Sequence, residues 1–167
     1  KQRANATPSA RPLRTVSNSL PPPVRGASVH LLTPLIADAL ELHLAAREAH
    51  WNVRGPNFLS LHELFDRVST ELEAHADALA ERVRTLGGEA RAQSRWIAVT
   101  TSQPAYPNGT KRHVAELASR LARFSAACRR SIDPAQTGGD AVTADLLTEI
   151  AGEVDKVAWL VESHERE

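Results

Sequence analysis

The chain has 167 residues, of which 42% are hydrophobic and 24% charged, and its formal net charge is zero. This length fits one domain with a sizeable core, and no apolar run approaches the roughly 18 residues of a membrane span. The single cysteine, Cys128, excludes an internal disulfide framework and is compatible with a reducing compartment.

Residues 1–28 differ from the rest of the chain in composition. They are rich in Pro, Ala, Ser and Arg, and they carry five basic residues and no acidic one, so the remainder carries −5. The basic residues are Lys1, Arg3, Arg11, Arg14 and Arg25. Because apolar periodicity is absent, the sequence predicts a flexible basic arm over 1–28 and one folded domain over 29–167. A plain solvated tail is the alternative interpretation of the arm.

Two helices are predicted in the first half of the folded domain. The first begins at about residue 28 or 33, where Pro34 suits an early helical position, and it ends at Arg54-Gly55-Pro56. The second covers about residues 58–86, roughly 43 Å, and stops at Gly87-Gly88. Its apolar stripe has three-to-four spacing and comprises Leu61, Leu64, Phe65, Val68, Leu72, Leu79, Val83 and Leu86.

A long crossover over residues 89–109, with a short helix around 90–97, leads to the second half. A third helix is predicted over about residues 111–131, and a fourth runs from an Asp140 cap to Glu162. Two helical hairpins joined by a long crossover between helices 2 and 3 predict an all-α, up-down four-helix bundle of the ferritin-like type.

Four residues of metal-ligand type lie on the first two helices: His50, His62, Asp77 and Glu81. On a helical wheel, Asp77 and Glu81 fall about 60° and 100° from His62, apart from the apolar stripe at about 200–320°. Along the axis, however, His62 lies about 22 Å from Asp77 and about 28 Å from Glu81, whereas metal–ligand bonds measure about 2.0–2.2 Å. One chain therefore cannot close such a site, but two antiparallel copies about a two-fold axis can.

The ligand types favour iron, manganese or zinc, because imidazole and carboxylate are present without thiolate. The E-x-x-H motif of a di-iron site inside one bundle is absent, which argues against the ordinary ferritin arrangement. The alternative is that the histidines are ordinary interfacial residues and the carboxylates are solvated helix residues.

Three segments resemble the Dps family, the miniferritins named as DNA-binding proteins from starved cells. They are AHWNVRGPNFLSLHELFD, the D-x-x-x-E pair followed by R and LGG, and GDAVTADLLTEIAGEVDKVAWLVE, within a match over about residues 29–165. The resemblance implies that His50 and His62 of one subunit and Asp77 and Glu81 of its two-fold mate hold iron, with zinc as a substitute ion. It also implies a hollow homododecameric shell built from two-fold dimers, which oxidises Fe(II), preferably with hydrogen peroxide, and stores ferric iron. The location expected from the family is cytoplasmic and nucleoid-associated, with no membrane partner.

The resemblance also suggests roles for residues around this site. Asp66 is expected close to the metal, where it would hydrogen-bond a ligand histidine or steer iron inward, unless it is a solvated charge. Glu63 is a candidate for mineral nucleation. Trp51, next to His50, would absorb stray oxidising equivalents or simply pack.

Asp140, Asp145 and Glu149 match the region that lines cation-attracting pores in the family. For Asp140, a helix N-cap is the alternative or an additional role. Four other residues are interpreted as structural, as core, interface or ordinary helix positions: His43, His75, Cys128 and Trp159.

The acidic body should repel a duplex, so DNA binding is expected only from the arm residues, by sequence-independent counterion release. Two functions remain open: a ferroxidase and iron store that protects DNA, or a mainly structural nucleoid-compacting protein with secondary iron binding. A zinc hydrolase is a more distant third, because no H-E-x-x-H motif is present.

Overall fold

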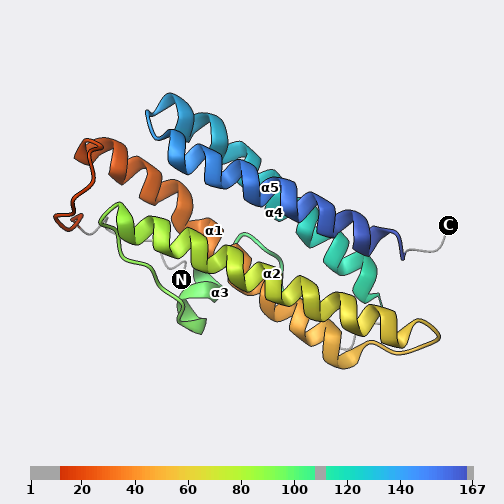
Figure 1. Ribbon diagram of the computed structural model, residues 1–167. Helices are drawn as coiled ribbons and strands as arrows, with labels where there is room; N and C mark the ends of the chain where they lie inside the picture. The colour runs from red at the N-terminus through yellow and green to blue at the C-terminus, as the bar shows by residue number, and fades with distance from the viewer. Residues whose placement is uncertain (1–11, 108–111, 165–167) are drawn as a thin grey trace, which may run out of the picture.

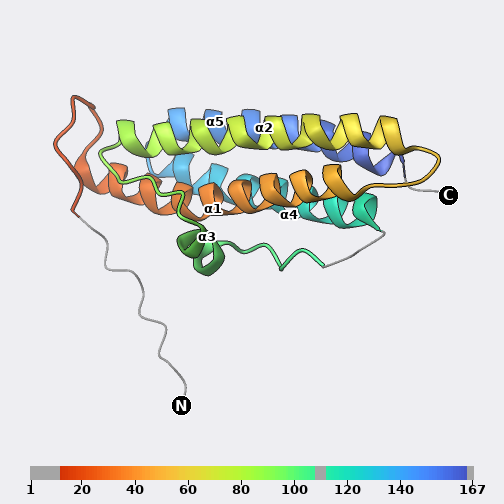
Figure 2. The same ribbon diagram turned by 90° about the horizontal axis from the view of Figure 1, so that it is seen from below.

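Two antiparallel helical hairpins form the body of the protein in the computed structural model, which describes residues 12–107 and 112–164. The helices are α1 (Pro22–Asn52), α2 (Phe58–Thr85), α3 (Ser94–Thr100), α4 (His113–Thr137) and α5 (Ala141–Glu162), and the described part of the chain contains no strand. In Figures 1 and 2, α1 and α2 form one hairpin, α4 and α5 form the other, and the two lie alongside each other. The predicted all-α ferritin-like bundle is confirmed.

The core lies between the two hairpins, where each long helix contributes the apolar face that its sequence predicted. All predicted stripe residues of α2 are buried except Leu64, which is partly buried against the core. By length and composition α1 is apolar enough to cross a bilayer. Its apolar side chains, including Leu32, Leu42 and Ala46, instead belong to this core, so α1 is a core helix.

The crossover runs along the bundle and carries α3 (Figure 2). Two buried charged residues hold it in place. Asp38 of α1 accepts hydrogen bonds from the Thr101 and Ser102 hydroxyls, each at 2.7 Å. Arg120 of α4, which is 1% exposed, donates to the Pro104 and Ala105 carbonyls at 2.6 and 2.8 Å. The Arg120 bonds satisfy backbone carbonyls that a loop packed on a bundle would otherwise leave unpaired.

Helix α1 begins at Pro22, so the prediction of a start at residue 28 or 33 was wrong. Prolines at the first helical positions need no hydrogen-bonded N–H, and the Arg25 amide makes an early helical bond to the Pro21 carbonyl at 3.1 Å. Pro34 lies inside the helix on an exposed position and does not start it. Similarly, α4 continues past the predicted end at 131, because Ala135 is still buried against the bundle, and it stops before Gly139, whose φ is 92°.

Part of the predicted arm is docked on the end of α2. The Arg14 amide donates to the Gly87 carbonyl at 2.9 Å, and the Arg25 guanidinium donates to the Leu86 carbonyl at 3.0 Å. A Cβ at Gly87, whose φ is 88°, would lie 2.6 Å from the Arg14 carbonyl oxygen, so the close approach requires glycine. The prediction of a flexible arm was therefore wrong for residues 14–28, while Lys1, Arg3 and Arg11 lie outside the described residues.

Candidate functional site

The two predicted ligand histidines lie side by side at the end of the α1–α2 hairpin. His50, in the last turn of α1, and His62, in the second turn of α2, stack with ring centroids 3.7 Å apart. Each Nδ1 lies 2.8 Å from the backbone carbonyl oxygen of the other residue. The antiparallel hairpin thus builds a reciprocal pair of hydrogen bonds, which confirms that His50 reaches the same place as His62.

These bonds decide the tautomer of both rings. A carbonyl oxygen can only accept, so each Nδ1 must carry the proton and donate it. The lone pair of each imidazole is then on Nε2, the atom available for a metal ion. A histidine ligand held by a hydrogen bond from its other nitrogen is the usual arrangement in metal sites, because the bond fixes the ring and raises its basicity.

The predicted carboxylate ligands lie elsewhere on α2. Asp77 and Glu81 are both exposed, about 22 and 28 Å from His62 along the helix axis. Asp77 lines a shallow cavity of about 250 Å³ together with Glu73 and Arg91. Within the described part of the chain, no three His, Cys, Asp or Glu side chains are grouped to hold a metal ion. The histidines and the carboxylates are therefore separate in one chain, and we refer to them as the two half-sites of the predicted metal site.

Apolar side chains surround the histidine half-site and face solvent. Trp51 is 70% exposed and Leu59 is 64% exposed, and the ring of Phe58 stacks on His62 at a centroid distance of 5.1 Å. Apolar side chains gathered on a surface indicate a contact with another molecule. At this exposure Trp51 is not a core residue of the chain.

Asp66 takes a different partner from the one predicted. Its carboxylate forms an ion pair with the Arg47 guanidinium, and both histidine Nδ1 atoms are bonded to carbonyls instead. Within one chain Asp66 therefore pairs with Arg47 and does not bond Nδ1 of either histidine.

The predicted pore residue Asp140 is buried and fully bonded inside the chain. It is 1% exposed and accepts hydrogen bonds from Ser28 Oγ, Arg82 Nη2 and Thr143 Oγ1, each at 2.6 Å. It also accepts from the Thr143 amide at 3.0 Å, which confirms its role as the N-cap of α5. Burial opposes ionisation, but the bonds from Ser28 and Thr143 and the charge of Arg82 outweigh it and hold the pKa of Asp140 below its ordinary value. A pore role for Asp140 is therefore wrong, whereas Asp145 and Glu149 are exposed.

The remaining predicted residues have simpler surroundings. Cys128 is fully buried, and burial raises the pKa of its thiol to about 12, as expected for a core residue. His43 contacts the Ser69 carbonyl through Nδ1 at 2.9 Å, which confirms a structural role. Glu63 is exposed. Trp159 is 62% exposed, so it is not a core residue of this chain.

Sequence reasoning missed two features of the structure. The groups that orient the histidines are backbone carbonyls, which have no residue signature. A cavity between α2 and α5, lined by His75 and Glu153, was missed because its members are 78 positions apart in the sequence. The sequence signal for it was the i,i+4 spacing of Glu71 and His75 on α2 and of Glu149 and Glu153 on α5.

Known proteins match most of this chain. Residues 29–167 match the family model described as the ferritin-like domain. The chain is 35% identical over 153 residues to the "DNA protection during starvation protein" of Agrobacterium fabrum, covering 90% of this chain and 94% of that protein. The protein of the same name from Brevibacillus brevis is 32% identical, over 80% of this chain and 91% of the relative.

Solved structures agree with these matches. DpsC from Streptomyces coelicolor superposes with a TM-score of 0.89 at 30% identity, covering 93% of this chain and 92% of that one. Dps from Microbacterium arborescens, in a structure of its high iron form, gives a TM-score of 0.81 at 29% identity, covering 90% and 98%. The resemblance seen in the sequence is thereby confirmed, and the chain belongs to the Dps family of ferritin-like proteins.

Proposed function

We propose that this protein is a Dps-type miniferritin that oxidises Fe(II) and stores ferric iron, and so protects DNA from oxidative damage. The observation that carries the proposal is the reciprocal bonding of His50 and His62, which leaves Nε2 of both rings free for a metal ion. A relative titled as a high iron form and relatives named for DNA protection support the same function.

The oxidation site is shared between subunits. His50 and His62 form one half and Asp77 and Glu81 the other, and a two-fold axis between antiparallel α2 helices brings the halves of two chains together. The exposed apolar side chains around the histidines would be covered in this contact. Such dimers would assemble further into a hollow dodecamer.

Iron is the substrate at this site. One hydrogen peroxide accepts two electrons from two Fe(II) ions and, with two protons, yields two water molecules and two Fe(III) ions, so no hydroxyl radical is released. The imidazoles bind Fe(II), and the carboxylates of Asp77 and Glu81 offset the extra charge of Fe(III). Glu63 would help nucleate mineral, Asp66 would bind iron near the site, Trp51 would take stray oxidising equivalents, and Asp145 and Glu149 would line an entry pore.

DNA binding is proposed for the arm alone. Arg25 cannot contribute, because it is buried and donates to carbonyls; Lys1, Arg3, Arg11 and the exposed Arg14 remain. Deletion of residues 1–11 should abolish gel retardation of DNA at low salt and leave iron oxidation intact. Retained retardation would assign binding to the shell. If the deletion removed DNA binding and iron oxidation proved negligible, the mainly structural function would be favoured.

Substitution of both histidines tests the oxidation site. The variant His50→Ala/His62→Ala should lose rapid peroxide-dependent Fe(II) oxidation, followed by absorbance of the ferric product, and should elute from a sizing column like the parent. His30→Ala, which removes an exposed histidine far from the site, should keep full activity. Oxidation at the parental rate in the double variant would refute the site.

A further inference from the structure

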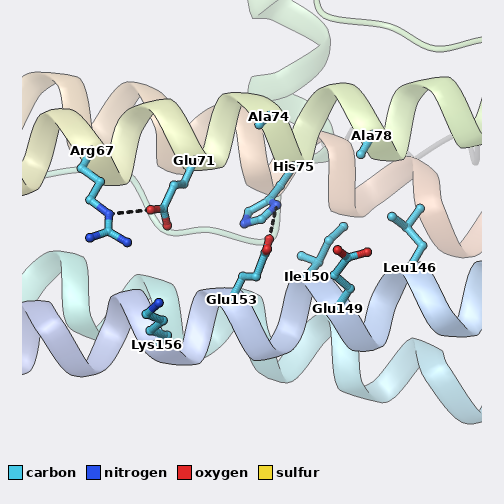
Figure 3. Close-up of a pocket in the computed structure, with 10 residues that line it drawn as sticks. All are labelled: Arg67, Glu71, Ala74, His75, Ala78, Leu146, Glu149, Ile150, Glu153 and Lys156. Atoms are coloured by element: carbon cyan, nitrogen blue, oxygen red, sulfur yellow. Dashed lines mark hydrogen bonds and ion pairs between the residues drawn. The ribbon is translucent and has the colours of Figure 1, made fainter.

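A cavity of about 400 Å³ lies between α2 and α5 (Figure 3), and none of the four proposed iron ligands lines it. Its charged and polar lining comes from Arg67, Glu71 and His75 of α2 and from Glu149, Glu153 and Lys156 of α5. All six residues belong to one chain and lie on two helices that pack together in the bundle.

His75 is the buried member of this group. It is 7% exposed and projects from α2 toward α5. Its Nε2 has no hydrogen-bond partner among the described residues, and its Nδ1 lies 3.7 Å from Glu153 Oε2. That separation is too long for a hydrogen bond. His75 thus differs from His43, whose Nδ1 is bonded to a carbonyl.

The 3.7 Å gap fits a bridging cation. Two ligands bound to one transition ion at about 2.0–2.2 Å each lie about 3–4 Å apart. If the proton is on Nε2, the Nδ1 lone pair faces a carboxylate oxygen, and two acceptors can be joined only by a donor or a cation. A cation between them would bind both Nδ1 of His75 and the carboxylate of Glu153.

Two further carboxylates lie close to this pair. As they stand, the described residues place only His75 and Glu153 together, without a third ligand. Glu149 is exposed and precedes Glu153 by one helical turn on the same face, so a side-chain rotation can add it as the third ligand. Glu71 lies one turn before His75, but it already pairs with Arg67 at 2.6 Å. Lys156 lines the same cavity and competes with a cation for the carboxylates.

We propose that His75 and Glu153, joined by Glu149, bind a divalent first-row transition cation within each single chain. One imidazole with carboxylates and no thiolate is the ligand set for ions such as Fe(II), Mn(II), Co(II) or Zn(II). The inference goes beyond the proposed function, because this site needs neither a partner chain nor iron oxidation.

Cobalt binding tests the site directly, with Co(II) as the probe. In the background His50→Ala/His62→Ala, which lacks the shared sites, calorimetry should still find one Co(II) per chain, with an absorption spectrum that shows nitrogen coordination. Adding Glu153→Gln should weaken binding by at least about tenfold. Adding Lys156→Gln should strengthen it several-fold, because the competing ammonium is gone. Glu162→Gln, at an exposed position of α5 outside the cavity, is the matched control and should change nothing.

Crystals of the same background soaked in Co(II) should show an anomalous peak at bonding distance from His75. Absence of Co(II) binding in this background, or binding that Glu153→Gln leaves unchanged, would overturn the proposal. Neither result would bear on the ferroxidase, since its histidines are already removed.

Discussion

The two ends of the α1–α2 hairpin hold polar clusters of opposite character. At one end, the carboxylate oxygens of Asp140 accept hydrogen bonds from Ser28, Arg82 and Thr143. At the other end, His50 and His62 each form a hydrogen bond within the chain through Nδ1, and Nε2 of each ring is free. The first cluster is complete inside one chain, whereas the second keeps two ring nitrogens available for a partner.

This contrast separates structural from functional polar residues better than residue type does. Asp140 and Asp77 are both aspartates on or beside a helix, yet one is buried and bonded and the other is exposed. The candidate site is recognised by side-chain atoms without a bonding partner in the described part of the chain, such as Nε2 of His50 and His62, whose rings are held in place by backbone carbonyls.

The largest loss of folding stability is expected when Asp140 loses its charge partner. Arg82→Ala would leave the carboxylate of Asp140 buried without its charge partner, and breaking a buried ion pair costs about 3–5 kcal/mol. Urea unfolding followed by circular dichroism measures the loss. The control is Arg129→Ala, because Arg129 and Asp155 form an exposed pair with side chains 56% and 47% accessible, and such pairs contribute under about 1 kcal/mol. Equal losses in the two variants would show that the cluster is not structural.

A smaller loss is expected from removing one neutral donor of the same cluster. Ser28→Ala deletes the 2.6 Å bond to Asp140, and a hydrogen bond to a charged group contributes about 1.5–3 kcal/mol. The same unfolding assay applies, with Ser119→Ala, at an exposed position of α4, as the control. A loss no larger than that of the control would contradict the assignment.

The stabilisation by Asp140 should depend on pH in one direction. Its folded pKa is lowered, so its contribution is complete above the unfolded carboxyl pKa of about 3.9 and is lost as the pH falls through the lower folded value. The stability difference between the parent and Asp140→Asn should therefore stay constant from neutral pH to about pH 4 and shrink below it. A difference that shrinks between pH 8 and pH 6 would point to another group.

The smallest effect on folding stability is expected from changes to Asp77 and Glu81. Asp77→Asn/Glu81→Gln alters two exposed side chains, and surface changes of this kind usually shift stability by about 0.5 kcal/mol or less. Iron oxidation should nevertheless be lost. A large loss of stability in metal-free protein would show that these carboxylates are structural.

The sequence predicted the helices where periodicity was long and undisturbed, as in α2 and α5. It failed at the start of α1, because Pro34 gives the same signal inside a helix as at its beginning. For the site, spacing showed that His62 and Asp77 could not meet in one chain. The orientation of His50 and His62 could not be predicted, since backbone carbonyls fix it. Likewise, Asp140 could not be recognised as buried, because its partners Ser28 and Arg82 are distant in the sequence.

In the proposed dimer, each oxidation site takes its histidines from one chain and its carboxylates from the other. Mixing subunits tests it: His50→Ala/His62→Ala chains and Asp77→Asn/Glu81→Gln chains should each be inactive alone. When the two are unfolded together and reassembled at equal ratio, half of the dimers are mixed and each of these regains one of two sites. The account therefore predicts recovery of about a quarter of the parental Fe(II) oxidation. No recovery in a correctly assembled mixture would contradict the shared site.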